Sequence, residues 1–203
     1  MINRKLIYKI LGQLLFIEAF LLFVSLLVAF YYQQDDIFAF IVATLTTIGG
    51  GLVLKWRGHG ADNSMSRRDA YLVVTLSWIV FSFFGTLPFM VSGYINNFTD
   101  AYFETMSGFT TTGATILDDV ECFPHGLLFW RSLTQWIGGL GIVFFTIVFA
   151  AEATGPIKTK LHPRLSTSAK WIWSIYLMLT IACIASYYVA GMNLFDSFNY
   201  AMT

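Results

Sequence analysis

The residues with the clearest potential for chemistry form a short polar loop, residues 110–115 (TTTGAT), between two apolar segments. A threonine-rich backbone with one glycine can direct its carbonyl oxygens toward one point, where they replace the water shell of a cation. Non-helical backbone at membrane depth occurs only where it is buried in protein or lines a water-filled cavity. The loop therefore predicts a cation-binding stretch of backbone.

A short amphipathic segment, residues 100–108, precedes the loop and must position it. It is too short to cross a hydrocarbon core of about 30 Å. We expect a half-membrane helix whose first backbone N–H groups are capped by Thr99 or Asp100. Its C-terminal end, the negative end of the helix dipole, then points at residues 110–113 and favours a cation.

The composition indicates an all-α polytopic membrane protein. Of the 203 residues, 57% are hydrophobic and 12% charged, whereas soluble domains have about 25% charged residues. Nucleic-acid binding has no support, because no basic patch is interleaved with aromatic residues outside the apolar segments. Cys122 and Cys183 match no metal-site spacing and predict free thiols. The expected spans are residues 6–32, 37–54, 70–95, 126–151 and 171–190.

Basic residues are distributed unevenly along the chain. Eleven of the twelve Lys and Arg residues lie in residues 4–9, where the first span begins, or in residues 55–69 and 152–170. Five crossings and one re-entrant hairpin place all eleven inside if the N-terminus is cytoplasmic, as the positive-inside rule requires. Asp35, Asp36 and the acids of residues 116–124 then lie outside, so we expect the loop to be entered from an acidic external face.

Apart from Lys9 at the start of the first span, two charged residues lie within apolar spans. Arg131, the twelfth basic residue, lies in the first turns of the fourth span. It either binds an acid or carbonyls of the pore hairpin, or extends to the nearby interface. Glu18 lies near the centre of the first span. We expect it to be hydrogen-bonded to a neighbouring helix, with a functional role as the alternative.

Asp118, Asp119 and Glu121, near His125, allow a different class of function. Such carboxylates can hold a divalent metal in a membrane-embedded enzyme, for instance one acting on lipid head groups. We favour a solvated acidic rim that raises the local cation concentration, because no further His or Asp cluster accompanies them. We therefore expect a transporter and not an enzyme. A non-conducting structural membrane subunit is the third alternative.

The pore-helix segment recurs at the end of the chain. Residues 100–107 (DAYFETMS) align without gaps to residues 196–203 (DSFNYAMT), with Asp and Met identical. Each copy follows a span that ends outside, which predicts a repeated span–pore helix–filter loop–span unit. One hairpin cannot enclose a pore. We therefore expect the N-terminal part of a transporter, truncated after the start of the second pore helix.

Three regions follow from this repeat. Residues 1–68 hold two N-terminal spans and a basic cytoplasmic loop. Residues 69–152 form the first unit, and residues 153–203 hold a cytoplasmic loop, the next span and the start of the second pore helix.

Three segments carry a family resemblance: residues 103–115, 130–141 and 163–170. With them the chain resembles the Trk/Ktr/HKT superfamily of potassium transporters, most closely the bacterial Trk-type (TrkH-like) membrane subunits. The likeness extends over essentially the whole chain. It implies four fused units around one pore, each giving one filter strand with a central glycine. The expected function is potassium uptake across the bacterial inner membrane.

The resemblance also implies roles for individual residues. Gly113 becomes the filter glycine, and Thr111, Thr112 and Ala114 flank it and offer backbone carbonyls to K⁺. A glycine at this place accompanies potassium permeation, and a serine in plant relatives accompanies sodium. The residues expected to support the filter are Asp100, Glu104, Thr110, Thr115 and Arg131. Family members form homodimers in the lipid membrane and associate with a cytosolic nucleotide-binding regulatory subunit. No cofactor is expected besides K⁺ as the transported ion.

Overall fold

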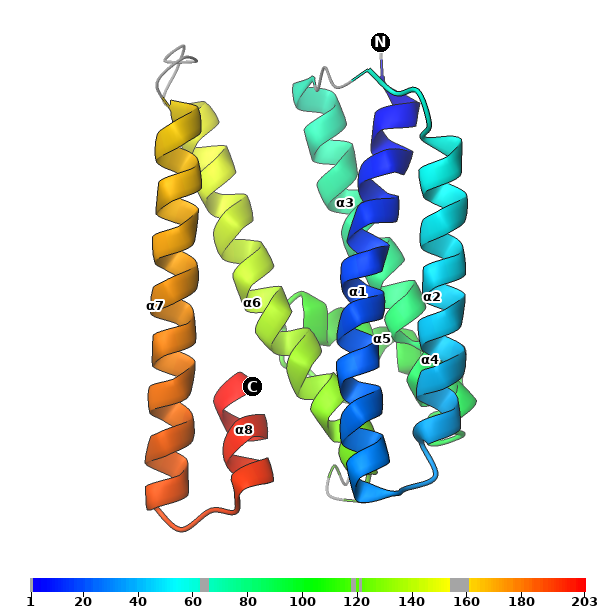
Figure 1. The fold of residues 1–203 in the computed structure, drawn as a ribbon, viewed down its shortest axis with the longest axis vertical. Helices are drawn as coiled ribbons and strands as arrows, with labels where there is room; N and C mark the ends of the chain where they lie inside the picture. The colour runs from blue at the N-terminus through cyan, green and yellow to red at the C-terminus, as the bar shows by residue number, and fades with distance from the viewer. Residues whose placement is uncertain (1, 63–65, 118–119, 121, 154–160) are drawn as a thin grey trace. The chain divides into compact units, whose positions relative to one another are not determined.

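The computed structural model describes residues 2–62, 66–117, 120, 122–153 and 161–203, with the backbone alone at residues 67, 142–153 and 161–169. All regular secondary structure in these ranges is helical (Figure 1), which confirms the all-α fold. The helices are α1 (Arg4–Tyr32), α2 (Ile37–Arg57), α3 (Arg67–Gly85), α4 (Leu87–Val91), α5 (Phe98–Phe109), α6 (His125–Ala153), α7 (Leu161–Val189) and α8 (Leu194–Met202).

Several helices are long and apolar enough to cross a membrane. In the described part of the chain these are Arg4–Tyr32, Ile37–Arg57, Arg68–Val91 and Lys170–Val189. Helix α6 has 29 residues, or about 43 Å at 1.5 Å per residue, which exceeds the hydrocarbon thickness. The chain is therefore a multi-pass membrane protein.

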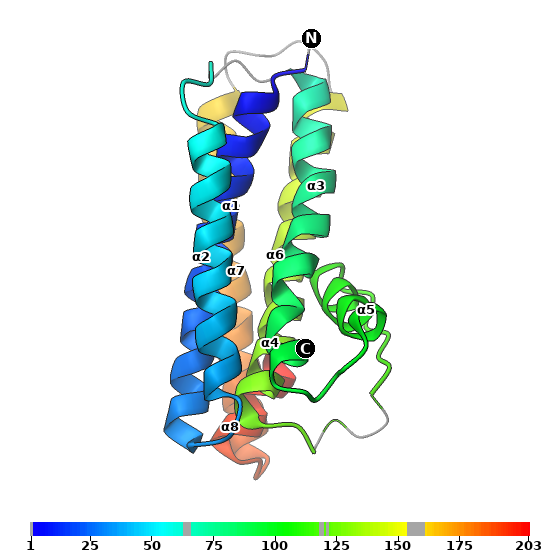
Figure 2. The same ribbon diagram turned by 90° about the vertical axis from the view of Figure 1, so that its right-hand side faces the viewer.

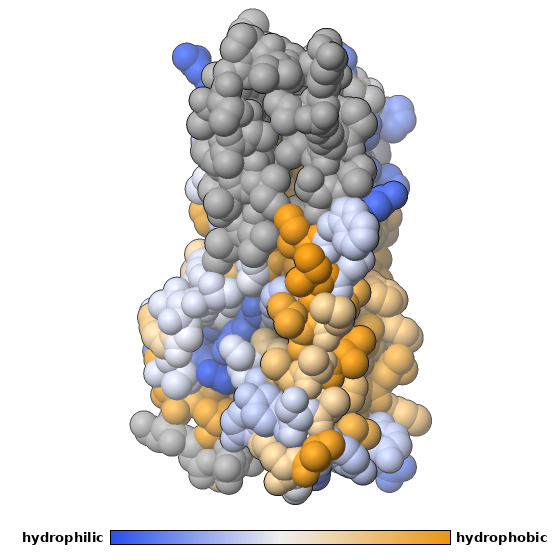
Figure 3. Space-filling view, turned by 90° about the vertical axis from the view of Figure 1, so that its left-hand side faces the viewer, coloured by the Kyte–Doolittle hydropathy of each residue, from blue (hydrophilic) through white to orange (hydrophobic). Residues whose placement is uncertain are grey.

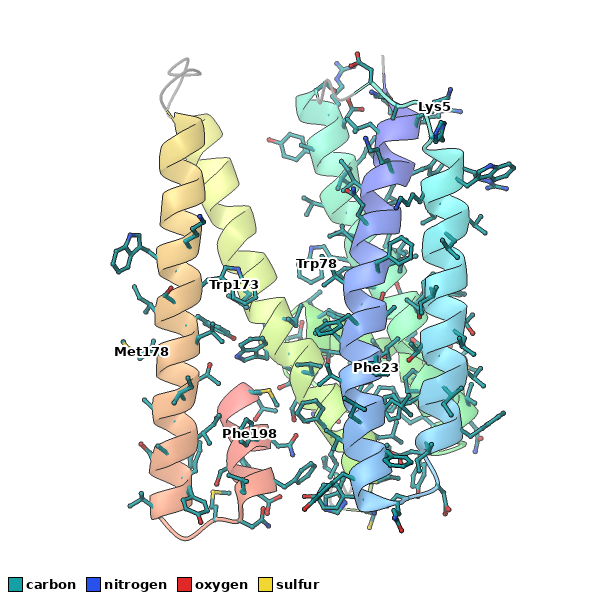
Figure 4. All side chains as sticks on the ribbon, in the orientation of Figure 1. Lys5, Phe23, Trp78, Trp173, Met178 and Phe198 are labelled. Carbon is teal, nitrogen blue, oxygen red and sulfur yellow. The ribbon has the colours of Figure 1, made fainter. Side chains whose placement is uncertain are left out.

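Apolar side chains cover much of the described surface, as a lipid-facing protein requires. Figure 3 shows orange, hydrophobic side chains over part of the described surface of one face, beside paler and blue, more polar ones. On α7 the side chain of Met178 projects away from the ribbon (Figure 4) and is 62% exposed. On α1 and α2, Phe20 and Leu45 are exposed to a similar degree. These side chains need an apolar solvent, which lipid supplies.

Two span boundaries differ most from those expected. The third span ends at Val91 instead of residue 95, because the chain turns at Gly93, whose φ is +78°. Helix α7 begins at Leu161, ten residues before the expected start at 171. Pro163 lies in the first turn of α7, where its missing N–H has no intrahelical partner to lose.

The chain divides into two compact units, Met1–Arg131 and Ser132–Thr203. This division concerns packing alone. The repeat-based regions 1–68, 69–152 and 153–203 describe a different property and stay a prediction.

In the first unit, α1 and α2 pack as an antiparallel hairpin with close backbone contact. A Cβ atom added to Gly12 would lie 2.8 Å from the Lys55 nitrogen and 2.9 Å from the Gly51 oxygen. Glu18 of α1 is buried, and in the described structure its carboxyl oxygens have no hydrogen-bond partner. The expected bond to a neighbouring helix is therefore wrong. The buried Thr47 hydroxyl of α2 donates a hydrogen bond within its own helix, to the Ala43 carbonyl at 2.7 Å.

The start of α1 is attached to the loop between α2 and α3. The Asn3 N–H donates to Asp69 Oδ1 (2.9 Å), and its side-chain amide donates to the Asp62 carbonyl (2.9 Å). Ser66 and Asp69 together form a capping box at the start of α3. The two basic segments that contain Lys5 (Figure 4) and Arg57 thus lie at the same end of the first unit, as the charge pattern requires.

The third span is broken between α3 and α4. Pro88 has no N–H to donate to the Phe84 carbonyl, four residues earlier. The Gly85 carbonyl beside the break accepts a hydrogen bond from the Trp130 indole N–H at 2.9 Å. Trp130 is fully buried. The break is therefore filled by a side chain of α6.

In the second unit, α6 contacts α7 through Trp136. Its indole N–H donates to the Thr180 hydroxyl (3.1 Å), and the Tyr176 hydroxyl donates to the Trp136 carbonyl (3.1 Å). Helix α7 ends before Gly191, whose φ of +100° reverses the chain. Helix α8 follows and packs back on α7.

Candidate functional site

Helix α5 is the predicted pore helix, and it begins two residues earlier than expected. Asn97 caps it by accepting the Thr99 N–H at 3.0 Å. The expected caps, Thr99 and Asp100, are therefore wrong. Asparagine caps a helix as well as aspartate does and better than threonine, so Asn97 can start the helix earlier. Asp100 lies in the first turn, where its negative charge complements the helix dipole. Figure 2 views α5 nearly end-on while α1, α2 and α3 run vertically, so α5 crosses the direction of the spans.

The C-terminus of α5 passes directly into the candidate loop. The Thr112 N–H donates to the Ser107 carbonyl and the Thr111 N–H to the Gly108 carbonyl, both at 3.0 Å. This pattern places Thr111 at the left-handed position of a Schellman motif, with φ +54°. Glycine normally occupies that position, and a β-branched residue there is strained.

A second left-handed residue follows at Gly113, with φ +74°. The carbonyl oxygens of Thr111, Thr112 and Gly113 accept no hydrogen bond from any part of the chain that the structure describes. All three residues are exposed. Three consecutive acceptors are thus free to bind something other than this chain.

The threonine hydroxyls of the loop serve to stabilise its backbone. Thr110 Oγ1 donates to the Met106 carbonyl at 2.7 Å and lies 2.8 Å from Thr112 Oγ1. Thr111 Oγ1 donates to the Thr110 carbonyl at 2.7 Å. These hydroxyls therefore hold the turn in place and leave the next carbonyls unoccupied.

The exit of the loop is fastened back to α5. The Ser107 hydroxyl donates to the Ala114 carbonyl at 2.6 Å. The Thr115 hydroxyl and the Ile116 N–H both donate to Glu104 Oε2, at 2.9 and 3.2 Å. One carbonyl predicted to bind an ion, that of Ala114, thus already accepts one hydrogen bond. Loop entry and exit are both held by a single helix.

Arg131 of α6 completes this support. Its Nε lies 2.6 Å from Glu104 Oε1, and the two side chains are 16% and 2% exposed. Of the two alternatives for Arg131, the structure shows pairing with an acid of the pore hairpin. A buried carboxylate is costly unless it is paired and hydrogen-bonded. Glu104 meets both conditions, since it binds Arg131 with one oxygen and the loop with the other.

Residues not anticipated from sequence also hold α5. A Cβ atom at Gly85 would lie 2.7 Å from Thr105 Cγ2 and 3.2 Å from the rings of Phe109 and Trp130. The lack of a side chain at Gly85 therefore lets α3, α5 and α6 meet. Ser107 was also missed. The repeat could have indicated it, because Ser107 aligns there with another residue that carries a hydroxyl group, Thr203.

The residues that cap α5 and α8 extend the alignment between the two copies of the repeat. Asn193 caps α8 by accepting the Asp196 N–H at 2.7 Å, and it occupies the position of Asn97 at the start of α5. The cap carbonyls of Asn97 and Asn193 each accept an N–H at 3.0 Å, from Ala101 and Ser197 respectively. The similarity therefore covers the cap and first turn as well as the eight residues recognised from sequence.

The acids expected on the external face differ in their surroundings. Asp36 is fully buried and accepts the Leu127 N–H at 3.2 Å, and its place on the external side of the membrane stays a prediction. The structure does not describe three of the predicted external acids, Asp118, Asp119 and Glu121. The alternative of a metal-dependent enzyme depends on these acids and is therefore not tested. Within the described ranges no three His, Cys, Asp or Glu residues gather in a way that could hold a metal ion.

Known proteins resemble this chain over nearly its whole length. The Trk system potassium uptake protein TrkH of Halomonas elongata is 34% identical over 215 residues, covering 99% of this chain and 45% of its own length. An uncharacterized cation transporter of Methanocaldococcus jannaschii is 31% identical, covering 97% of this chain. The crystal structure of the potassium transporter TrkH from Vibrio parahaemolyticus matches 98% of this chain with a TM-score of 0.86 and 32% identity.

The chain spans about 45% of the length of the curated relatives it matches. The family model described as "TrkH: Cation transport protein" matches residues 33–203. This match includes α2 to α8 and therefore the whole candidate loop with its support. The chain belongs to the TrkH family of cation transport proteins.

Proposed function

We propose that this chain is part of a potassium uptake transporter and that residues 111–113 supply one strand of its selectivity filter. The carrying observation is the run of three consecutive carbonyls, at Thr111, Thr112 and Gly113, that accept no hydrogen bond in the described structure. The names of the relatives from H. elongata and V. parahaemolyticus support K⁺ as the ion.

The carbonyl oxygens replace part of the hydration shell of K⁺. Selection against Na⁺ depends on the number of carbonyls and on the geometry in which they are held. The hydrogen-bonded turn at Thr111 and the Glu104 contacts hold that geometry before the ion arrives. The C-terminal end of α5 adds a partial negative charge behind the site.

The remaining filter strands come from other repeats of the complete transporter. The cap and first turn shared by α5 and α8 support such repetition. In this proposal the protein lies in the bacterial inner membrane with a cytoplasmic N-terminus, forms a homodimer and associates with a cytosolic nucleotide-binding subunit. The basic segments at one end of the first unit support the orientation.

The test replaces the filter glycine in the full-length transporter. Gly113→Ser should lower the K⁺/Na⁺ uptake ratio in proteoliposomes. Gly60→Ser is the matched control, because Gly60 has a similar φ of +71° and, like Gly113, has no atom near an added Cβ. It imposes comparable backbone strain outside the loop and should preserve the ratio. An unchanged ratio in Gly113→Ser would show that this loop is not the filter.

A further inference from the structure

The turn between α1 and α2 contacts the first residues of α6. The Tyr32 ring stacks on the His125 ring with centroids 4.0 Å apart. Gln34 Oε1 accepts the His125 backbone N–H at 2.7 Å and lies 3.0 Å from His125 Nδ1. Asp36 Oδ2 accepts the Leu127 N–H at 3.2 Å. All these residues belong to the first compact unit.

These contacts provide hydrogen-bond acceptors for the first N–H groups of α6, which the residue before the helix cannot provide. The first N–H groups of a helix have no partner within it, and the residue before the helix usually caps them with a side-chain oxygen. Pro124 occupies that position, since its carbonyl accepts the Leu128 N–H at 3.0 Å, and proline has no such oxygen. Gln34 and Asp36, 91 residues earlier, supply the acceptors instead.

The site around Asp36 is closely packed. An added Cβ at Gly126 would overlap the Asp36 carboxylate and lie 2.8 Å from Ala29 Cβ and 2.9 Å from Phe40 Cε2. Asp36, Ala29 and Phe40 are all fully buried. Glycine at position 126 is therefore what allows the carboxylate to approach the helix start. The contact between the Asp36 carboxylate and the start of α6 therefore lies in the packed interior.

The capped turn leads directly to the loop support. Arg131 lies four residues after Leu127 on α6, about 6 Å along the helix axis. Arg131 binds Glu104, and Glu104 binds Thr115 and Ile116. A shift of the α6 start along its axis therefore moves the group that holds the exit of the loop.

We propose that Gln34 and Asp36 are positioning residues for ion selection: by capping α6 they set the place of Arg131 and, through Glu104, the geometry of residues 111–113. Neither residue touches the ion. The two N-terminal helices thereby act on the filter unit through their connecting turn. This inference rests on the proposed function of the loop.

The experiment measures the K⁺/Na⁺ uptake ratio and the KM for K⁺ of the full-length transporter in proteoliposomes. Asp36→Ala removes the cap and should lower the ratio by at least about fivefold, well within the roughly hundredfold effect that a displacement of about 1 Å can have on a preorganised site. Asp36→Asn keeps a side-chain acceptor and should recover most of the ratio. Asp35→Ala removes a charge from the same turn and should leave the ratio unchanged.

The outcomes separate the two proposals. The positioning role is overturned if the wild type is K⁺-selective and both Asp36→Ala and Gln34→Ala leave the uptake ratio and the KM unchanged. This holds even if the variants unfold at lower temperature. A wild type without K⁺ preference overturns the proposed function instead. If Asp36→Ala does not reach the membrane, Gln34→Ala decides, because it removes only the acceptor for His125.

Discussion

Glu104 Oε1 lies 2.6 Å from Arg131 Nε, and the second oxygen of the same carboxylate accepts the Thr115 hydroxyl at 2.9 Å. One buried acid thus joins the pore helix, the loop exit and the following span. Its two functions, neutralising Arg131 and holding the loop, can be separated by mutation.

Removing one partner of the Arg131–Glu104 pair should be more harmful than neutralising both. Arg131→Met leaves a buried carboxylate without its cation, which costs about 3–5 kcal/mol. The double variant Arg131→Met/Glu104→Gln keeps an acceptor for Thr115 and should recover part of that loss. Thermal unfolding in detergent and the K⁺/Na⁺ ratio provide the measurements. Additive effects of the two changes would contradict a direct coupling.

Thr111 tests the strain at the start of the loop. Thr111→Gly should stabilise the protein by about 1 kcal/mol, because glycine adopts a φ of +54° without the cost that a side chain brings. It should also lower ion selectivity, since the backbone becomes more flexible. Thr112→Gly, at a residue without positive φ, should not stabilise. Equal unfolding temperatures for both glycine variants would argue against strain at Thr111.

Gly85 tests the packing of α3 against α5. Gly85→Ala should destabilise the protein by about 1–3 kcal/mol through overpacking, because the new methyl group would meet Thr105 Cγ2 at 2.7 Å. Thr105→Ser removes that methyl group and keeps the hydroxyl that donates to the Ala101 carbonyl. The double variant should therefore recover stability.

Gly49→Ala is the control for this prediction, since no atom lies within 4 Å of a Cβ atom added there. It should leave the unfolding temperature unchanged or raise it, because alanine favours helix over glycine. A loss equal to that of Gly85→Ala would show that packing at Gly85 is not the cause.

Asp36 should make stability depend on pH. Burial raises the pKa of its carboxyl, although the N–H groups of Gly126 and Leu127 and the nearby His125 oppose this effect. Between the unfolded pKa of about 3.9 and the higher folded pKa, the folded state binds more protons. The free energy of unfolding therefore falls as pH rises through this window. Below the window the contribution of Asp36 is fully present.

Asp36→Asn should remove this part of the pH dependence, because the amide does not titrate. Chemical unfolding of wild type and variant at several acidic pH values measures the difference. Asp35→Asn is the control from the same turn. Parallel stability curves for wild type and Asp36→Asn would contradict a raised pKa at Asp36.

Local patterns were sufficient to predict the spans, the short helix and the loop. Each depends on a contiguous property: a run of apolar residues, a segment too short to cross, or threonines beside one glycine. The repeat was visible for the same reason, since α5 and α8 carry similar residues in the same order. The boundaries predicted least well, at Val91 and Leu161, depend on a turn and on a proline whose effect varies with its position in a helix.

The sequence by itself determined that this chain is a membrane protein with a polar backbone loop after a short helix, because length and polarity act locally. Only the tertiary structure decided which acid Arg131 binds, that Asn97 caps α5, and that buried Asp36 caps α6 in place of Pro124. These outcomes depend on which helix ends meet in space. A residue distant in sequence can satisfy a free N–H or a buried charge as well as a neighbour can, so no local pattern reveals the partner.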